Sequence, residues 1–221
     1  MRLKPHHSFK GVTMKKFTDA DFQTQLGNVI AELEQASQIE IVVLIKQRSA
    51  NYDDVPMGLA ANLSLLTFSI LFFIEMGIDD YIIYFATLAA FGLGLLIALA
   101  LPFVQRLLVG KKRKLRNVEI MARALFQKGG LHHTSTQVGT LIYISLLEKM
   151  AYIVSDRGAQ MAIPEQQWQI ITSNLNNIFK TKNPPESLLK ELTKCKETFK
   201  QYIPALENNI NELPNDLRID L

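Results

Sequence analysis

The sequence predicts an α/β fold, with a small mixed sheet packed with helices, that is interrupted by a two-helix transmembrane hairpin. Three observations lead to this prediction: two long apolar runs near the middle of the 221-residue chain, helical periodicity on both sides of them, and short β-branched runs. The expected divisions are a basic N-terminal arm at 1–16, the first part of the α/β domain at 17–56, the hairpin at 57–105, the second part of the domain at 106–203 and a C-terminal tail at 204–221.

The first part of the domain begins with an amphipathic helix over about residues 19–36. Thr18 and Asp21 have the spacing of a capping box, with Thr18 as the N-cap, and Phe17 can staple onto Phe22. One apolar stripe then follows at alternating steps of four and three: Phe22, Leu26, Val29, Leu33 and Ala36.

Three β-like runs are expected to form the sheet. Residues 39–45 are nearly all apolar and β-branched, which is typical of a buried central strand. Residues 140–147 and 151–154 are separated by a link so short that they must pair antiparallel. A helix at 112–128 lies on the connection from the first run to the second, so those two strands should be parallel.

The stretch 58–104 predicts the membrane hairpin. Its charged residues are Glu75, Asp79 and Asp80, which cluster in the middle and leave apolar runs of about 17 and 23 residues. A bilayer core about 30 Å thick requires about 20 apolar residues in a helix. The alternative is a pair of buried helices in a soluble protein, but the rest of this short chain offers little mass to cover both on all sides.

Basic residues on the flanks of the hairpin predict its orientation. Lys111–Arg116 contains five of them directly after the hairpin, and Arg106 precedes these. The link between the two apolar runs has none. Because basic flanks stay on the cytoplasmic side, both termini are expected in the cytoplasm.

Two further helices are expected near the C-terminus. Pro164 suits the first turn of a helix that reaches Phe179 and has Trp168 on its inner face. Asn183 then caps a helix that Pro204 ends. Cys195, the single cysteine, falls in the apolar stripe of this last helix, so we predict that it packs in the core and does not act as a nucleophile.

Composition narrows the possible partners. The 24 basic and 21 acidic residues nearly balance, so the chain has no global positive field for nucleic acid. The first residues lack the apolar core of a secretory signal, and Met14 is an alternative start to Met1. The expected partners are therefore the lipid bilayer and other membrane proteins.

Carboxylates near the strand ends suggest a site for a hard cation. Asp53 and Asp54 follow the first strand, and Glu148 follows the second, which should end at the same edge of the sheet. Three carboxylates could hold Mg²⁺ or Ca²⁺ through oxygen. Asp156 is a weaker candidate, which could equally bond Arg157 or a backbone amide. The alternative is that Asp53 and Asp54 form an ordinary polar turn and Glu148 a hairpin turn.

The chain contains two distinctive stretches, QIEIVVLIKQRSANYDDVP and LHHTSTQVGTLIYISLLEKMAYIVSDRGAQMAIPEQQW. Both resemble the TPM domain family, in particular its membrane-inserted bacterial subgroup. The resemblance covers about residues 17–203 outside the hairpin. The positions that carry it in the second stretch are Thr134, Gly139, Ser145, Leu146, Glu148, Ile153, Asp156, Arg157, Gly158 and Trp168.

The resemblance implies an α/β sandwich, divalent-metal binding or phosphatase activity, and a role in the assembly or repair of membrane complexes. We therefore expect a protein of the bacterial inner membrane whose cytoplasmic TPM-like domain binds membrane partners. The alternative is a Mg²⁺- or Ca²⁺-dependent phosphatase that uses Asp53, Asp54 and Glu148. A transporter subunit is disfavoured because neither apolar run carries an ionisable residue at mid-depth.

Overall fold

The computed structural model describes residues 16–74, 77–131, 137–205 and 218–220. Predictions that rest on the N-terminal arm, Glu75 or Thr134 fall outside these residues. The chain forms two compact units: one comprises Met1–Ser49 and Asn117–Leu221, and the other comprises Ala50–Arg116. Each unit is described by itself.

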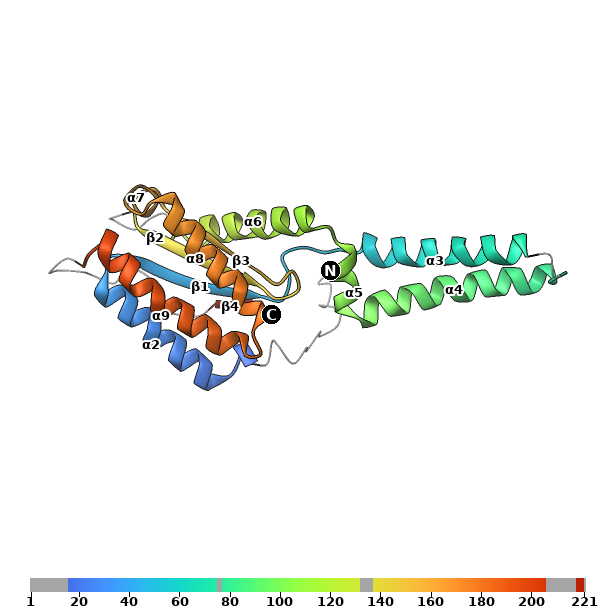
Figure 1. Ribbon diagram of the computed structural model, residues 1–221, viewed down its shortest axis with the longest axis horizontal. Helices are drawn as coiled ribbons and strands as arrows, with labels where there is room; N and C mark the ends of the chain where they lie inside the picture. The colour runs from blue at the N-terminus through green and yellow to red at the C-terminus, as the bar shows by residue number, and fades with distance from the viewer. Residues whose placement is uncertain (1–15, 75–76, 132–136, 206–217, 221) are drawn as a thin grey trace, which may run out of the picture. The chain divides into compact units, whose positions relative to one another are not determined.

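The first unit contains the sheet and most of the helices (Figure 1). Its described elements are α2 (Ala20–Ala36), β1 (Glu40–Lys46), the greater part of α6 (Lys111–Lys128), β2 (Gly139–Ser145), β3 (Met150–Ser155), α7 (Arg157–Ala162), α8 (Glu165–Asn177), the 3₁₀ turn η2 (Ile178–Lys180), α9 (Pro184–Tyr202) and β4 (Arg218–Asp220).

The described strands form one mixed sheet in the order β3-β2-β1-β4. β1 and β2 are parallel, with Lys46 opposite Ser145 at their carboxyl ends, and β2 and β3 are antiparallel. Both predicted pairings are confirmed. The parallel pairing of β4 with β1 was not predicted; a three-residue strand gives almost no periodic signal, so its pairing depends on a partner remote in sequence.

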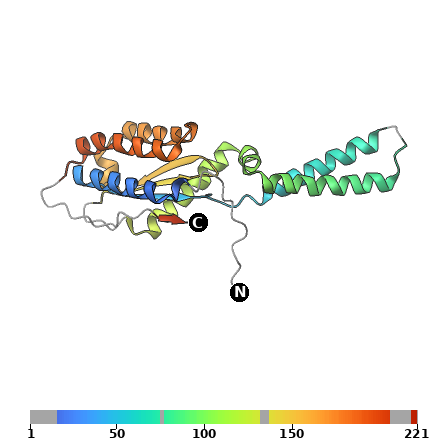
Figure 2. The same cartoon turned by 90° about the horizontal axis from the view of Figure 1, so that it is seen from below.

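Helices cover both faces of the sheet (Figures 1 and 2). Because side chains alternate along a strand, Ile41, Val43 and Ile45 of β1 face a core built with α2, α8 and α9. Val42 and Leu44 face a smaller core built with α6. β1 is therefore apolar on both sides, which explains its unbroken apolar run in the sequence.

The start of α2 differs from the predicted capping box. The N-cap is Asp19, not Thr18, and its side chain makes no capping hydrogen bond. Asp19 is in the extended conformation required of an N-cap, so the helix begins one residue later than the Thr18 pattern implies. The predicted staple is present, since the rings of Phe17 and Phe22 meet edge to face with centroids 5.4 Å apart.

The outer edge of the sheet at β3 is covered by side chains from helices. Asn176 of α8 accepts a hydrogen bond from the backbone N–H of Ala151 at 3.0 Å and donates one to its carbonyl at 3.1 Å. Gln160 of α7 donates to the carbonyl of Ser155 at 2.6 Å. An open strand edge is a template for pairing with another chain, and these contacts occupy it.

Replacing Asn176 with alanine should destabilise the first unit by about 1–3 kcal/mol, because the buried backbone of Ala151 would lose both partners. Trp168 is the single tryptophan and lies buried in this unit, so its fluorescence reports unfolding in denaturant. Asn174→Ala, at an exposed position of the same helix, is the control and should change stability by less than about 0.5 kcal/mol. Equal stability of the two variants would contradict the assigned role of Asn176.

The second unit contains α3 (Asp54–Phe73), α4 (Asp80–Ala100), α5 (Pro102–Leu108) and the first residues of α6. α3 and α4 pack closely enough that a Cβ on Gly94 would lie 2.8 Å from the Cα of Ala60. Ser64 of α3 donates a hydrogen bond to the carbonyl of Thr87 in α4 at 3.2 Å. Both helices are long and apolar enough to span a membrane.

The break between α4 and α5 has an identifiable cause. Pro102 lacks the N–H that would bond the carbonyl of Ala98 in a continuous helix. The side-chain amide of Gln105 donates to that carbonyl instead, at 3.0 Å, and Gln105 is buried. The chain therefore turns here without leaving the carbonyl unpaired.

Candidate functional site

A cluster of buried polar side chains lies at the carboxyl ends of β1 and β2. It consists of Ser49 after β1, Tyr143 and Ser145 of β2, and Glu148 in the turn to β3, each less than 5% exposed. The parallel register brings these ends together, and Leu146 N–H extends the pairing by bonding the carbonyl of Lys46 at 3.0 Å.

Glu148 is the centre of this cluster. One carboxylate oxygen accepts the backbone N–H of Ser49 at 2.9 Å, and the other accepts the hydroxyl of Ser145. The Ser49 hydroxyl is 2.9 Å from that of Tyr143, and burial raises the pKa of Tyr143 to about 12, so the phenol stays protonated at neutral pH. Both carboxylate oxygens thus have hydrogen-bond donors from the protein, as a buried carboxylate requires.

Asp53 and Asp54 belong to the second unit, at the start of α3. Asp54 forms a two-pronged ion pair with Arg113, with N–O distances of 2.6 and 2.8 Å. The same guanidinium lies over the ring of Tyr52, 5.2 Å from its centroid. Asp53 is the N-cap of α3 but makes no side-chain capping bond. The pair joins the start of α3 to the first turn of α6.

Asp156 caps α7. Its side chain accepts the backbone N–H of Arg157 at 2.7 Å, which is one of the partners considered from sequence. The other carboxylate oxygen is buried and has no hydrogen-bond partner among the residues that the structure describes. Sequence reasoning missed the six-residue helix that Asp156 starts.

The carboxylates in these arrangements do not fit a cation site. Among the described residues, no group of three or more His, Cys, Asp and Glu side chains gathers closely enough to hold a metal ion. Asp54 has both oxygens on Arg113, and Glu148 has both on protein donors. Mg²⁺ or Ca²⁺ would have to displace these contacts to reach either carboxylate.

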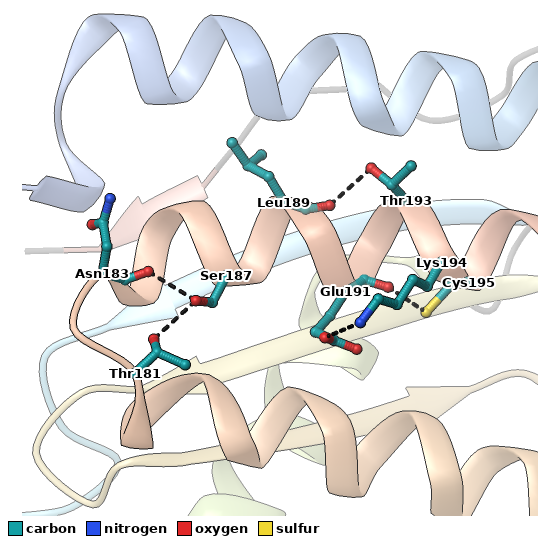
Figure 3. A network of polar contacts seen from close by, with 8 residues as sticks. All are labelled: Thr181, Asn183, Ser187, Leu189, Glu191, Thr193, Lys194 and Cys195. Atoms are coloured by element: carbon teal, nitrogen blue, oxygen red, sulfur yellow. Dashed lines mark hydrogen bonds and ion pairs between the residues drawn. The ribbon is translucent and has the colours of Figure 1, made fainter.

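A shallow depression beside α9 has a volume of about 130 Å³ and is lined by polar residues that include Thr181, Ser187 and Lys194. In Figure 3 the Ser187 hydroxyl bonds Thr181 and the carbonyl of Asn183, which ties the start of α9 to the preceding turn. Small-molecule sites in proteins usually measure about 300–1,000 Å³. The depression is too small for such a ligand.

Cys195 should react with a maleimide in the full-length protein only slowly, and rapidly once the protein is unfolded. It is buried in the main core, as predicted, and its thiol contacts the carbonyl of Glu191 (Figure 3). Burial raises its pKa to about 12, so raising the pH from about 7 to about 9 should produce little thiolate and little acceleration. The reference is an exposed thiol, introduced by Lys200→Cys in a Cys195→Ser background. If Cys195 in the native protein is labelled as fast as this reference thiol, it is not buried in the core.

Comparison with known proteins identifies the fold and no function. The chain matches no family model and no curated protein. It is similar to the NMR structure of the BA42 protein from the psychrophilic bacterium Bizionia argentinensis, with a TM-score of 0.59, 16% sequence identity, and coverage of 96% of this chain and 99% of that one. At this identity the similarity concerns the fold alone.

Proposed function

We propose that the protein is an integral protein of a bacterial inner membrane, in which α3 and α4 form a transmembrane hairpin and a cytoplasmic TPM-like domain binds membrane partner proteins. The observation that carries the proposal is the exposure of large apolar side chains along both helices. They are Met57, Leu65, Leu66, Phe68, Ile70, Phe72 and Phe73 of α3, and Tyr81, Ile82, Tyr84, Phe85, Leu88, Leu93, Leu96, Ile97 and Leu99 of α4.

This exposure favours a membrane over a soluble setting. A pair of core helices in a soluble protein would have these side chains buried, whereas apolar surfaces of this extent mark contact with lipid or another protein. Tyr81 and Tyr84, 75% and 64% exposed, lie near the start of α4. Tyrosines are enriched where a span meets the headgroups, so their position suits one end of a span.

Polar side chains within the two helices also suit lipid. Asn62, Thr67 and Ser69 of α3 each donate to the carbonyl four residues earlier, as does Thr87 of α4. In hydrocarbon an unpaired polar group costs several kcal/mol, so each donor needs such a partner. The basic residues after α4 and the lack of any between the helices support cytoplasmic termini.

A binding role suits the first unit better than catalysis. The buried carboxylate of Glu148 in this unit accepts hydrogen bonds from the backbone N–H of Ser49 and the hydroxyl of Ser145. Three large apolar side chains on helices of this unit face outward: Met161 at 76% exposure, Ile170 at 52% and Ile120 at 55%. Exposed apolar side chains of this kind are available to a partner protein.

Photo-crosslinking in native membranes tests the binding role. A photoreactive amino acid at Met161, Ile170 or Ile120 should give discrete crosslinks to a membrane protein, and the same residue at Lys182, exposed on a loop, should not. The absence of discrete crosslinks at all three positions would count against a partner on this unit.

The phosphatase alternative, and cation binding with it, has its own test. Calorimetry with Mg²⁺ and Ca²⁺ and turnover of a generic phosphate ester should both be negative. Metal-dependent turnover that Asp53→Ala abolishes would establish the alternative.

A further inference from the structure

The segment from Pro102 to Arg116 forms a surface of unusual character, which we call the basic collar. It consists of α5 and the first residues of α6, all in the second unit. It directly follows α4, the second proposed span. Apolar and basic side chains are exposed side by side along it.

The outward side of α5 is apolar. At about 100° per residue, Phe103, Leu107 and Leu108 fall within about 140° of one another on the helix. Their exposed fractions are 57%, 78% and 48%. Gln105 lies about 60° beyond Leu108, and it is buried with its side-chain amide on the carbonyl of Ala98 in α4. A helix with large apolar groups on one side and polar groups on the other is typical of a membrane interface.

The basic residues of α6 divide into two sets. Arg113 turns to Asp54, and Lys114 donates to the carbonyl of Arg106 at 3.0 Å. The other set, Lys111, Lys112 and Arg116, spans about 140° of the helix, and Arg113 lies about 60° beyond Arg116. These three are exposed, and none makes an ion pair with any residue of the described chain.

Helix stability does not explain this placement. Lys111–Lys114 occupies the first turn of α6, where the helix dipole favours negative charge, and no acidic residue is present in that turn. Four adjacent positive charges also repel one another. The Asp54 carboxylate neutralises Arg113 in this turn, and an external anion would relieve the charges that remain.

We propose that the basic collar binds the headgroups of anionic phospholipids, with Phe103, Leu107 and Leu108 inserted among the upper acyl chains and Lys111, Lys112 and Arg116 on the phosphates. The proposal rests on the membrane hairpin proposed above, since the chain then delivers the collar to the bilayer surface. Apolar and basic groups together match a lipid interface better than a free phosphate, which offers nothing for the apolar side of α5 to contact.

Spin-labelled lipids test this proposal directly. Full-length protein is reconstituted in phosphatidylcholine vesicles that contain a trace of spin-labelled phosphatidylglycerol or phosphatidylcholine, and the motionally restricted fraction gives the relative association constant. Each surface charge contributes about fivefold, so selectivity for phosphatidylglycerol should reach about fivefold or more and fall at high salt. The triple variant Lys111→Gln, Lys112→Gln and Arg116→Gln should lose most of it.

A matched triple variant separates the collar from net charge. Lys180→Gln, Lys182→Gln and Lys200→Gln remove the same charge from exposed positions elsewhere and should leave the selectivity intact. Equal loss of phosphatidylglycerol selectivity in both triple variants would overturn the collar proposal alone. The same conclusion would follow if the wild-type protein resisted alkaline extraction from the vesicles but showed no selectivity. Extraction of the wild-type protein by alkali would overturn the membrane hairpin itself.

Discussion

Glu148→Ala is expected to destabilise the first unit by about 3 kcal/mol or more. The substitution removes the acceptor of the Ser49 N–H and of the Ser145 hydroxyl, and both donors are buried. A buried donor left without a partner costs about 1–3 kcal/mol of stability. Hydrogen bonds to a charged group are stronger than those between neutral groups. Denaturant unfolding of the full-length protein in micelles, followed through Trp168 fluorescence, measures the loss.

Two further variants test whether the lost hydrogen bonds cause the destabilisation in Glu148→Ala. Glu148→Gln retains an acceptor for Ser49 and should lose less stability than Glu148→Ala. Glu197→Ala, which removes an exposed glutamate of α9, should change stability by less than about 0.5 kcal/mol. The whole series is run with a chelator present, so that a contribution from bound cation is excluded. A loss below about 1 kcal/mol for Glu148→Ala would mean that the cluster does not hold the strand ends.

Gly94→Leu is expected to separate α3 from α4 and to destabilise the second unit by about 2–3 kcal/mol. A side chain at this position meets the backbone of Ala60, which cannot rotate away, so the helices themselves must shift. Overpacking of a tight contact costs about 1–3 kcal/mol. Helices in lipid depend on close approach at small residues, which makes this contact the natural point of failure.

The neighbouring Gly92 offers the control. A Cβ there meets nothing within 4 Å, so Gly92→Leu should be tolerated. For both variants, the stability of the second unit is measured in lipid nanodiscs as the loss of helix content during unfolding, which far-UV circular dichroism follows. Trp168 fluorescence should be unchanged because that residue lies in the other unit. The close packing of α3 on α4 is refuted if Gly94→Leu and Gly92→Leu unfold alike.

Local periodicity was sufficient to predict most of the fold. The stripe in α9 and the apolar runs of β1 and β2 carry strong repeats, and the short link between β2 and β3 left one pairing possible. α7 and β4 are six and three residues long, too short for a repeat to appear. The start of α2 was misplaced by one residue because Thr18 and Asp19 are both good N-cap residues and the sequence pattern does not distinguish them.

The candidate site was less predictable because its contacts join distant residues. Glu148 was singled out as a cation ligand, but its partner Ser49 lies 99 residues earlier. Asp54 meets Arg113 across 59 residues, and Arg113 was read only as part of a basic run. The predicted parallel pairing of the two strands placed Glu148 at the edge where the first strand ends, but it did not show that the carboxylate bonds the backbone N–H of Ser49.

The central claim is that α3 and α4 cross a membrane as a hairpin and that the α/β unit stays in the cytoplasm. Paired alkaline phosphatase and green fluorescent protein fusions at Gly77, between the helices, and at Leu221 test it most directly in cells. We expect phosphatase activity without fluorescence for the fusion at Gly77, and fluorescence without phosphatase activity for the fusion at Leu221. A fluorescent, phosphatase-inactive fusion at Gly77 would contradict the central claim.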